Sequence, residues 1–379
     1  SGSFTGTNDN AVSFDIAFSE PIVDGNFTIA DDITITNAAT VGGSNLVNDG
    51  DNKNYTLNLT GVSGDGDITI TIKNAGASAI TDVSGNSMGA DEGPSSAITI
   101  DNTAPQATAV TIASNNGTSS DRAVTNNTIT LSFTVDDALS ALPTVSFTSG
   151  AVAIDNGVTV NDLGSMNYTA TYIVDAVDTD GSVDFSLSFT DDAGNAIAGS
   201  LDNTDLTSGT TVTVDNTRPT VVITRNAVTN GSVSGTNDNT VSFDIAFSED
   251  VSGFALSDII LDLGGATING VGTNGLAGDA AGFGGDVSLS TDVANSDFTV
   301  TVANVAGDGT LGITLTASAF TDNAGNQMSA NAVSNTFTID NTVPTVVITR
   351  NAVSSGSFTG TNDNAVSFDI AFSEPIVDG

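Results

Sequence analysis

Cysteine, histidine and tryptophan are absent from the sequence, and their absence excludes whole classes of chemistry. Without Cys or His the chain has no disulfide, no thiol nucleophile, no Ser-His-Asp triad and no thiolate or imidazole metal ligand. Paired carboxylates can cleave glycosidic bonds, but a chain with no Trp and only 3 Tyr has few side chains to line a sugar-binding cleft. We therefore expect no enzymatic activity.

Basic residues are scarce. The chain has 6 Lys and Arg against 45 Asp and Glu, a formal charge of -39. Such a chain repels nucleic acid and anionic membranes, so we expect neither as a partner. It contains no run of about 18 apolar residues, so we expect no membrane span in this segment. Two interpretations of the charge remain, a solvated surface suited to salty surroundings and a cation-binding protein, and the positions of the acids distinguish them.

The chain repeats itself. Residues 1–25 recur without change at 355–379, an offset of 354 residues. A short motif, DNTxP, occurs at 101–105, 215–219 and 340–344, with spacings of 114 and 125 residues. The repeat unit is therefore one domain of 114–125 residues, and three unlike domains make up a longer period.

These spacings predict the domain boundaries. We expect domains at 1–105, 106–219 and 220–344, and the beginning of a further domain at 345–379. The first lacks the TVVIT strand that opens the others, and the last 35 residues open a domain without finishing it. We therefore expect a segment of a longer array. A donor-strand arrangement is less favoured, because the same 25 residues stand at both ends.

Apolar residues alternate with polar ones in short runs, and no helical period is sustained. About seven such runs in each domain, separated by Gly, Asn and Asp, predict an all-β fold of tandem immunoglobulin-like β-sandwiches in an elongated array. The segment GFGGDVSLS (282–290) resembles one turn of a calcium-binding β-roll, but it occurs once and we expect a loop insertion. The second strand of each domain alternates most clearly: Val12, Phe14, Ile16 and Phe18; Ile129, Leu131, Phe133 and Val135; and Val241, Phe243, Ile245 and Phe247.

Acidic residues recur at four positions of the repeat. The first follows the second strand, in AFSE or its equivalent. The second is a D-x-x-G-N motif before the last strand, the third is an Asp-Gly turn before the penultimate strand, and the fourth is the Asp-Asn of DNTxP. In order, the candidate metal-ligating residues are Asp136, Asp137, Glu249 and Glu374; Asp191 and Asp322; Asp65, Asp180 and Asp308; and Asp101, Asn102, Asp215, Asn216, Asp340 and Asn341.

Strand direction brings these positions together. Strands of a seven-stranded sandwich alternate in direction, so the first and second positions face the preceding domain and the third and fourth face the following one. Each junction should then gather four or more carboxylates, which repel one another unless a cation lies among them. Ca²⁺ takes 6–8 oxygen ligands in flexible geometry, whereas Mg²⁺ needs a stricter octahedron. The sequence favours calcium, although Asp, Asn and Gly also simply form turns.

The set SFDIAFSE, D-x-x-G-N and DNTxP resembles the bacterial immunoglobulin-like repeats of giant adhesins exported by type I secretion, a group that includes RTX and biofilm proteins. The resemblance covers the whole chain, and the junction logic is similar to that of cadherins. It implies a sandwich fold, calcium at the junctions and an extender role. The ligands it implies are Asp101, Asn102, Asp137 and Asp191 at the first junction, Asp215, Asn216, Glu249 and Asp322 at the second, and Asp340, Asn341 and Glu374 at the third.

We therefore hypothesise a stalk that calcium stiffens on the bacterial cell surface or elsewhere outside the cell, supporting adhesion or biofilm formation. Its partners would be neighbouring repeats of the same chain. A chain without Cys suits export in an unfolded state from a cytosol low in calcium. The alternative is the repeat region of a self-assembling extracellular filament, sheath or surface layer, in which other copies of the protein would be partners.

Overall fold

The computed structural model describes residues 6–74, 79–226, 239–270, 278–291, 295–351 and 366–376. The chain divides into two compact units, Ser1–Asn216 and Thr217–Gly379.

The first unit contains two sandwiches. In the first, one sheet has the strand order β1-β7-β6-β3 and the other has the order β2-β5-β4. All neighbours are antiparallel except β1 and β7, which are parallel. The elements are β1 (Gly6–Thr7), β2 (Ala11–Ala17), α1 (Ile29–Asp32), β3 (Ile33–Asn37), β4 (Gly43–Asn48), β5 (Asn54–Thr60), β6 (Gly66–Ile72) and β7 (Ile98–Ile100).

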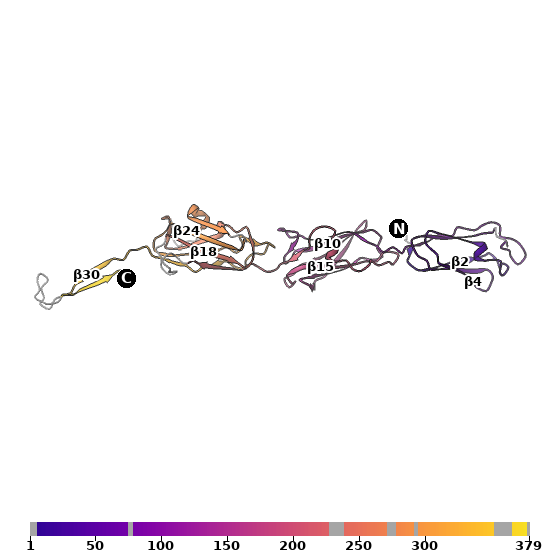
Figure 1. The fold of residues 1–379 in the computed structure, drawn as a ribbon, viewed down its shortest axis with the longest axis horizontal. Helices are drawn as coiled ribbons and strands as arrows, with labels where there is room; N and C mark the ends of the chain where they lie inside the picture. The colour runs from indigo at the N-terminus through magenta and orange to yellow at the C-terminus, as the bar shows by residue number, and fades with distance from the viewer. Residues whose placement is uncertain are drawn as a thin grey trace. The chain divides into compact units, whose positions relative to one another are not determined.

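The second sandwich has the sheets β13-β14-β10-β8 and β12-β11-β15-β16-β9, and Figure 1 labels one strand of each, β10 and β15. The main strands are numbered here in chain order. Read across the first sheet from β8 to β13, they are the first, second, fifth and fourth, which is the pattern of an immunoglobulin-like sandwich. The elements are β8 (Ala107–Ser114), β9 (Arg122–Ala123), β10 (Thr128–Val135), β11 (Thr144–Ser149), β12 (Val152–Ala153), β13 (Thr159–Gly164), β14 (Asn167–Ile173), β15 (Gly181–Ser188), η1 (Asn203–Asp205) and β16 (Thr213–Val214).

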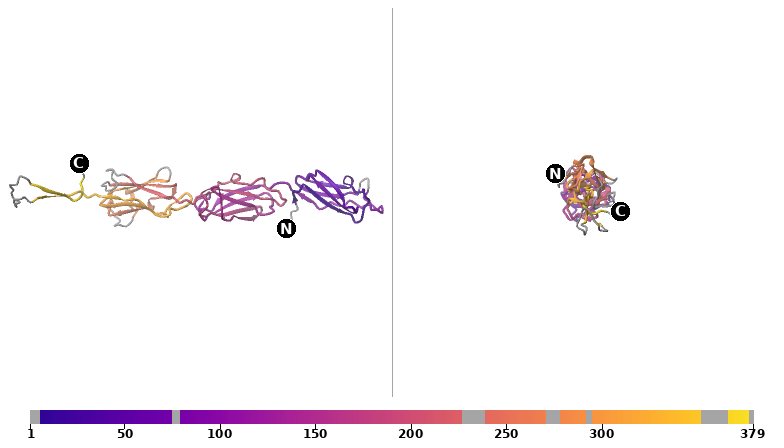
Figure 2. Two further views of the ribbon diagram at one scale, coloured as in Figure 1. Left: turned by 90° about the horizontal axis from the view of Figure 1, so that it is seen from below. Right: turned by 90° about the vertical axis from the view of Figure 1, so that its left-hand side faces the viewer.

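The second unit contains a third sandwich and a hairpin. The sandwich has the sheets β17-β18-β24-β23 and β22-β20-β26-β28, with β29 also paired to β26. Its elements are β17 (Val221–Arg225), β18 (Thr240–Phe247), β19 (Val251–Ser252), η2 (Leu256–Asp258), β20 (Ile259–Gly264), β21 (Thr267–Ile268), β22 (Gly278–Asp279), η3 (Ala280–Asp286), β23 (Val287–Thr291), β24 (Asp297–Ala303), β25 (Val305–Ala306), β26 (Gly309–Leu315), β27 (Thr321–Asp322), β28 (Ala332–Val333) and β29 (Phe337–Ile339). The hairpin, at the yellow end of the ribbon in Figures 1 and 2, consists of β30 (Val346–Arg350) and β31 (Phe368–Phe372).

The prediction of tandem, all-β, immunoglobulin-like sandwiches is confirmed. None of the helices in the described part of the chain is long and apolar enough to cross a membrane. One local prediction was wrong. The segment 282–290, expected as a loop insertion, ends in β23, because Val287 and Leu289 continue the strand alternation and β23 pairs with β24.

Three separate hydrophobic cores hold the sandwiches together, with buried residues drawn from 14–100, 110–214 and 241–339. The alternation along β10 is the clearest case, since its inward residues Ile129, Leu131, Phe133 and Val135 are all at most 3% exposed. Burying such side chains removes apolar surface from water, which is the main favourable term in folding. Alternation in the sequence therefore identifies the core face of this strand correctly.

The same five residues, FDIAF, occur at 14–18, 243–247 and 368–372, and the first and last copies lie in different environments. In β2 they lie in a sheet that packs on the first core, and Phe14 is 8% exposed. In β31 they form half of a hairpin, and the equivalent Phe368 is 55% exposed. Strand formation therefore follows from the sequence of the segment, whereas burial depends on which other strands are present.

We predict that Leu131→Ala, at a fully buried site, lowers the free energy of unfolding of the second sandwich by about 2–5 kcal/mol, because it removes buried methyl groups and leaves a cavity. The control is Leu163→Ala in the same sandwich, where the side chain is 65% exposed and we expect a change within about 0.5 kcal/mol. Urea unfolding followed by tyrosine fluorescence measures both, and equal midpoints for the two variants would contradict the assignment of the core.

Candidate metal centre

The DNTAP motif between the first two sandwiches is held in place by hydrogen bonds near both of its ends. The Asn102 N–H donates to Asp65 Oδ1 at 2.7 Å, and the Thr103 hydroxyl donates to Asp65 Oδ2 at 2.6 Å. The ring of Pro105 is buried. Beyond it, the Gln106 N–H donates to Asp136 Oδ1 at 2.7 Å. One end of this linker is thus bonded to the first sandwich and the other end to the second.

Asp136 takes the structural place of a serine. In the third sandwich the Thr220 N–H donates to Ser248 Oγ at 2.9 Å, in the same geometry as the bond from Gln106 to Asp136. In the hairpin, Thr345 and Ser373 make the same contact at 2.9 Å. Asp136 therefore caps the start of a strand, and Asp137 is the residue that corresponds to Glu249.

The D-x-x-G-N motif forms a tight turn around its own carboxylate. Asp191 is 1% exposed, and its Oδ1 accepts the N–H groups of Gly194 and Asn195, both at 2.7 Å. The Asn195 side chain donates to Asp191 Oδ2 at 3.0 Å. Gly194 has a φ of +101°, a conformation that residues with a side chain rarely adopt. The spacing of Asp, Gly and Asn thus follows from the geometry of the turn.

The same turn is tied to the preceding linker and to the loop that follows β10. The Asn195 side chain also donates to the Asp101 carbonyl oxygen at 3.0 Å. The Asp192 N–H donates to the Ala138 carbonyl at 3.0 Å, which holds the two loops of the second sandwich side by side. Asp101 and Asp137 are consequently brought to either side of the turn.

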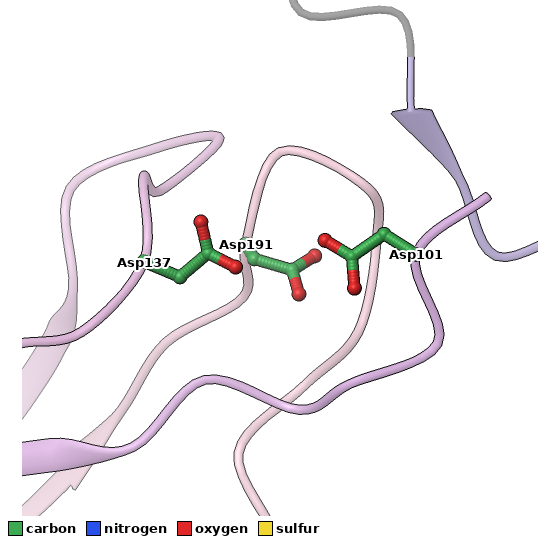
Figure 3. A group of neighbouring side chains, drawn as sticks. All are labelled: Asp101, Asp137 and Asp191. Carbon is green, nitrogen blue, oxygen red and sulfur yellow. The ribbon is translucent and has the colours of Figure 1, made fainter. Parts of the chain in front are cut away.

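Three carboxylates meet at this point. Each of Asp101, Asp137 and Asp191 offers one oxygen, and these atoms all lie within 4.8 Å of one another. Figure 3 shows the Asp191 carboxylate between those of Asp137 and Asp101, which come from opposite sides. Asp101 belongs to the linker of the first sandwich, and the other two belong to loops of the second. Strand direction predicted that these three positions of the repeat meet at one junction.

The charges at this cluster repel one another. Partial burial raises the pKa of the Asp101 carboxyl, and the nearby negative charges of Asp137 and Asp191 raise it further. The Thr103 N–H, which donates to Asp101 at 3.0 Å, opposes the effect. No lysine or arginine in the described ranges pairs with any of the three carboxylates. A bound cation would remove the repulsion.

The donor set fits calcium. Ca²⁺ is bound by oxygens at about 2.3–2.6 Å, so two ligands on opposite sides of one ion are at most about 5 Å apart. The oxygens of Asp101, Asp137 and Asp191 are within that limit. Carboxylates can bind through one oxygen or two, and backbone carbonyls and water complete the 6–8 ligands that calcium takes. These three residues would hold the ion, which would supply positive charge shared by two sandwiches.

The Asp-Gly turns hold the linkers. Asp65 binds Asn102 and Thr103, and these two donors lower its pKa. Asp308 likewise accepts the Asn341 N–H at 2.7 Å and the Thr342 hydroxyl, and its pKa is lowered for the same reason. Asp180 accepts the Asn216 N–H at 2.6 Å. The three carboxylates bond the linker that leaves their own sandwich, and their metal-ligand role stays a prediction.

In the second unit, a carboxylate oxygen of Glu249 lies within 4.8 Å of one of Asp322. Asp322 is fully buried, and its Oδ1 accepts the N–H groups of Ala324, Gly325 and Asn326 at 2.7–2.9 Å. The pair therefore repeats the arrangement of Asp137 and Asp191. Asp215, the equivalent of Asp101, is the last residue but one of the first unit.

The remaining predicted residues are the linker amides and the acids of the third junction. Asn216 donates from its side chain to the Asp175 carbonyl at 3.1 Å, and the Asn341 side chain donates to the Gly307 carbonyl at 2.7 Å. Asp340 accepts the Thr342 N–H at 3.2 Å. Glu374 is half-buried, and its Oε1 accepts no hydrogen bond. As with Asn102, the amide groups bond their own sandwich.

We predict that, with calcium chelated, Asp322→Ala lowers the free energy of unfolding of the third sandwich by about 1–3 kcal/mol, because the buried Ala324 N–H and two half-buried N–H groups of the turn lose their acceptor. The control is Asp262→Ala on β20, where the side chain is exposed and little change is expected. Native-state hydrogen exchange of the β20 and β26 amides measures the difference. Equal protection in the two variants would mean that Asp322 does not hold the turn.

We also predict that Asp65→Ala increases hydrogen exchange at the Asn102 amide severalfold, because that N–H loses its acceptor. Asp67→Ala, two residues further on in β6, is the matched control, since the Asp67 carboxylate accepts from the Thr99 hydroxyl and not from the linker. Exchange at Asn102 that rises equally in both variants would contradict the linker role of Asp65.

No protein-family model matches the chain, and no curated protein matches it either. Solved structures of tandem domains do match. One is a tetra-tandem repeat in the extending region of a large adhesion protein, at 17% identity and a TM-score of 0.26, with the match covering 97% of this chain and 86% of that one. A titin fragment matches at 12% identity and a TM-score of 0.23, and a pair of titin immunoglobulin domains at 7% and 0.22, each covering 63% of this chain and 98% of the other. These likenesses carry no inference about activity.

Proposed function

We propose that the chain is a set of extender repeats of an extracellular bacterial adhesin, in which calcium at the junctions holds neighbouring sandwiches in a fixed relation. The observation that supports this function best is the meeting of Asp101 from one sandwich with Asp137 and Asp191 from the next. The adhesin assignment rests on the motif set SFDIAFSE, D-x-x-G-N and DNTxP. Support of cell adhesion or biofilm formation, and a place on the cell surface, belong to the same proposal.

Repulsion among the three carboxylates makes the relation between the two sandwiches depend on a bound cation. Two unit charges about 5 Å apart repel by about 1 kcal/mol in a water-like dielectric and about 3 kcal/mol at an effective dielectric of about 20. Because Asp101 belongs to the end of the first sandwich, and Asp137 and Asp191 belong to the second, this repulsion drives the two sandwiches apart. An ion among them reverses its sign and draws the sandwiches together.

The hydrogen bonds of the linker limit what the ion has to do. Asn102 and Thr103 are already bonded to Asp65, and Gln106 is bonded to Asp136. Only the short segment around Pro105 is left to bend, and proline fixes its own φ. Removing the remaining freedom therefore requires little binding energy.

The expected affinity suits an extracellular protein. Extracellular calcium modules bind with a Kd of about 10⁻⁴–10⁻³ M. An ion present at about 100 times its Kd stabilises the state that binds it by about 2.7 kcal/mol. Each junction would then be open in a compartment with little calcium and closed outside the cell.

By the correspondence of motifs, the second junction would use Asp215, Glu249 and Asp322, and the third would use Asp340 and Glu374. The linker amides Asn102, Asn216 and Asn341 would support these sites by bonding their own sandwiches. Calcium is thus proposed as a repeated element of the array.

Spin labels test the proposal at the first junction. The chain has no cysteine, so Val47→Cys and Leu163→Cys, both at exposed positions, place one label on each of the first two sandwiches. We predict a narrow distribution of label distances in calcium chloride and a broader one after chelation, because the three carboxylates then repel.

Two further variants assign the effect to the site. Asp101→Asn together with Asp137→Asn keeps side chains of similar shape and removes two charges, so we expect calcium no longer to narrow the distribution. Asp184→Asn, an exposed acid on β15, is the control and should respond like the parent chain. Equal widths with calcium and with chelator in the parent chain would refute the proposal. Electron micrographs of multi-chain filaments would favour the alternative of a self-assembling fibre.

A further inference from the structure

A second acidic cluster lies within the second sandwich. Asp155, between β12 and β13, meets Asp175 and Asp178, between β14 and β15, and each offers an oxygen within 4.8 Å of the others. The eight residues of β15 separate this loop from Asp191, which at about 3.3 Å per residue puts the two clusters about 25 Å apart. The cluster is therefore distinct from the junction centre.

The loop that carries this cluster differs from its equivalents. Between β14 and β15 the sequence reads VDAVDTD (174–180), whereas the corresponding loops read GVSGD (61–65) and NVAGD (304–308). The loop of the second sandwich is two residues longer and has two additional carboxylates. The Asp-Gly turn that bonds the linker is common to all three, so holding the linker does not require the extra acids.

The loop holds its two carboxylates side by side. Asp175 Oδ1 accepts the N–H groups of Val177 and Asp178 at 2.8 and 3.1 Å, and the Asp175 N–H donates to Asp178 Oδ2 at 3.0 Å. Burial raises the pKa of Asp178, and the charges of Asp175 and Asp155 raise it further. Like charges are thus gathered where a turn alone would not need them.

Two buried oxygens without a partner adjoin this loop. The Asn156 side chain donates to the Ile173 carbonyl, just before the loop, and its Oδ1 is buried and accepts nothing. The Tyr172 side chain is 1% exposed, and its hydroxyl has no hydrogen-bond partner. Burial raises the pKa of Tyr172, and the charge of Asp178 raises it further, so the hydroxyl faces the negative potential of this loop. Buried polar atoms in native proteins nearly always have a partner, so both oxygens point to an occupant.

We propose that Asp155, Asp175 and Asp178 bind a divalent cation of the calcium type, with Asn156 Oδ1 as a further ligand. A water on the ion would give the Tyr172 hydroxyl its partner. The site goes beyond the proposed junction function, because all its ligands belong to one sandwich. It would order the loop whose backbone carbonyl groups receive the Asn216 side chain.

Terbium(III) chloride is the probe for this site. Terbium replaces calcium at oxygen sites and emits when a nearby aromatic side chain transfers its excitation. The chain has no Trp and 3 Tyr, Tyr55, Tyr168 and Tyr172. We expect tyrosine-sensitised emission from the full chain that calcium chloride competes away. Tyr172→Phe should remove most of the emission that depends on this site and leave calcium binding unchanged, whereas Tyr55→Phe should retain it.

Calcium stoichiometry supplies the second measurement. Asp155→Asn together with Asp178→Asn should lower the emission to the level of Tyr172→Phe and reduce calcium binding, measured by calorimetry, by one ion per chain. Asp101→Asn with Asp137→Asn, which removes the junction charges, should leave the Tyr172 emission in place. Circular dichroism in chelator checks that each variant folds. Unchanged stoichiometry in the Asp155 and Asp178 variant would overturn this site whatever happens at the junction.

Discussion

Like charges held close together are the constraint on which the rest of this structure depends. A formal charge of -39 is not spread evenly, because carboxylates meet where loops from two sandwiches approach each other. Asp101, Asp137 and Asp191 are kept within 4.8 Å by hydrogen bonds that involve neighbouring backbone groups, and those bonds oppose the repulsion. Positive charge at the centre of the three carboxylates would lower the energy of the arrangement. The two-sandwich geometry and the proposed need for calcium therefore have one origin.

The acidic residues have two structural roles, as acceptors of backbone hydrogen bonds and as members of carboxylate clusters. Asp65, Asp136 and Asp308 accept hydrogen bonds from backbone N–H groups and hold linkers and strand ends in place. Asp101 and Asp137 face another acid across a junction and have few donors of their own. Asp191 and Asp322 do both, since each organises its own turn and also lies beside a second carboxylate. Substitution of these two residues would therefore alter folding and cation binding together, which is why the cleaner charge variants are at Asp101 and Asp137.

Much of the fold could be predicted from the sequence, because alternation and turn residues are local signals. The inward residues of β10 and β18 are those that alternation identified. Strand direction was enough to bring Asp137 and Asp191 to the end of the sandwich that meets Asp101, whereas their calcium-binding role stays a prediction. Loop conformation was not accessible in this way. That Asp136 replaces a serine as a cap depends on a hydrogen bond to a residue far away in the chain, and the approach of Asp155 to Asp178 depends on how two separate loops pack. The burial of Phe14 likewise depends on strands that its own segment does not specify.

The spacing of identical segments has a consequence for biosynthesis. A strand such as FDIAF fits any sandwich built from the same sequence, so two adjacent identical domains risk exchanging strands while they fold. Here the unchanged 25-residue segment recurs after 354 residues, and the sandwiches between its two copies have different core residues, although the shorter FDIAF also stands at 243–247, 125 residues before its copy at 368–372. The entropy of closing a loop disfavours the encounter of the two distant copies, which leaves strand exchange mainly to the FDIAF segments of neighbouring domains. Unlike domains between the copies of the longer segment would thus limit how much of a long array of repeats can exchange strands while it emerges and folds.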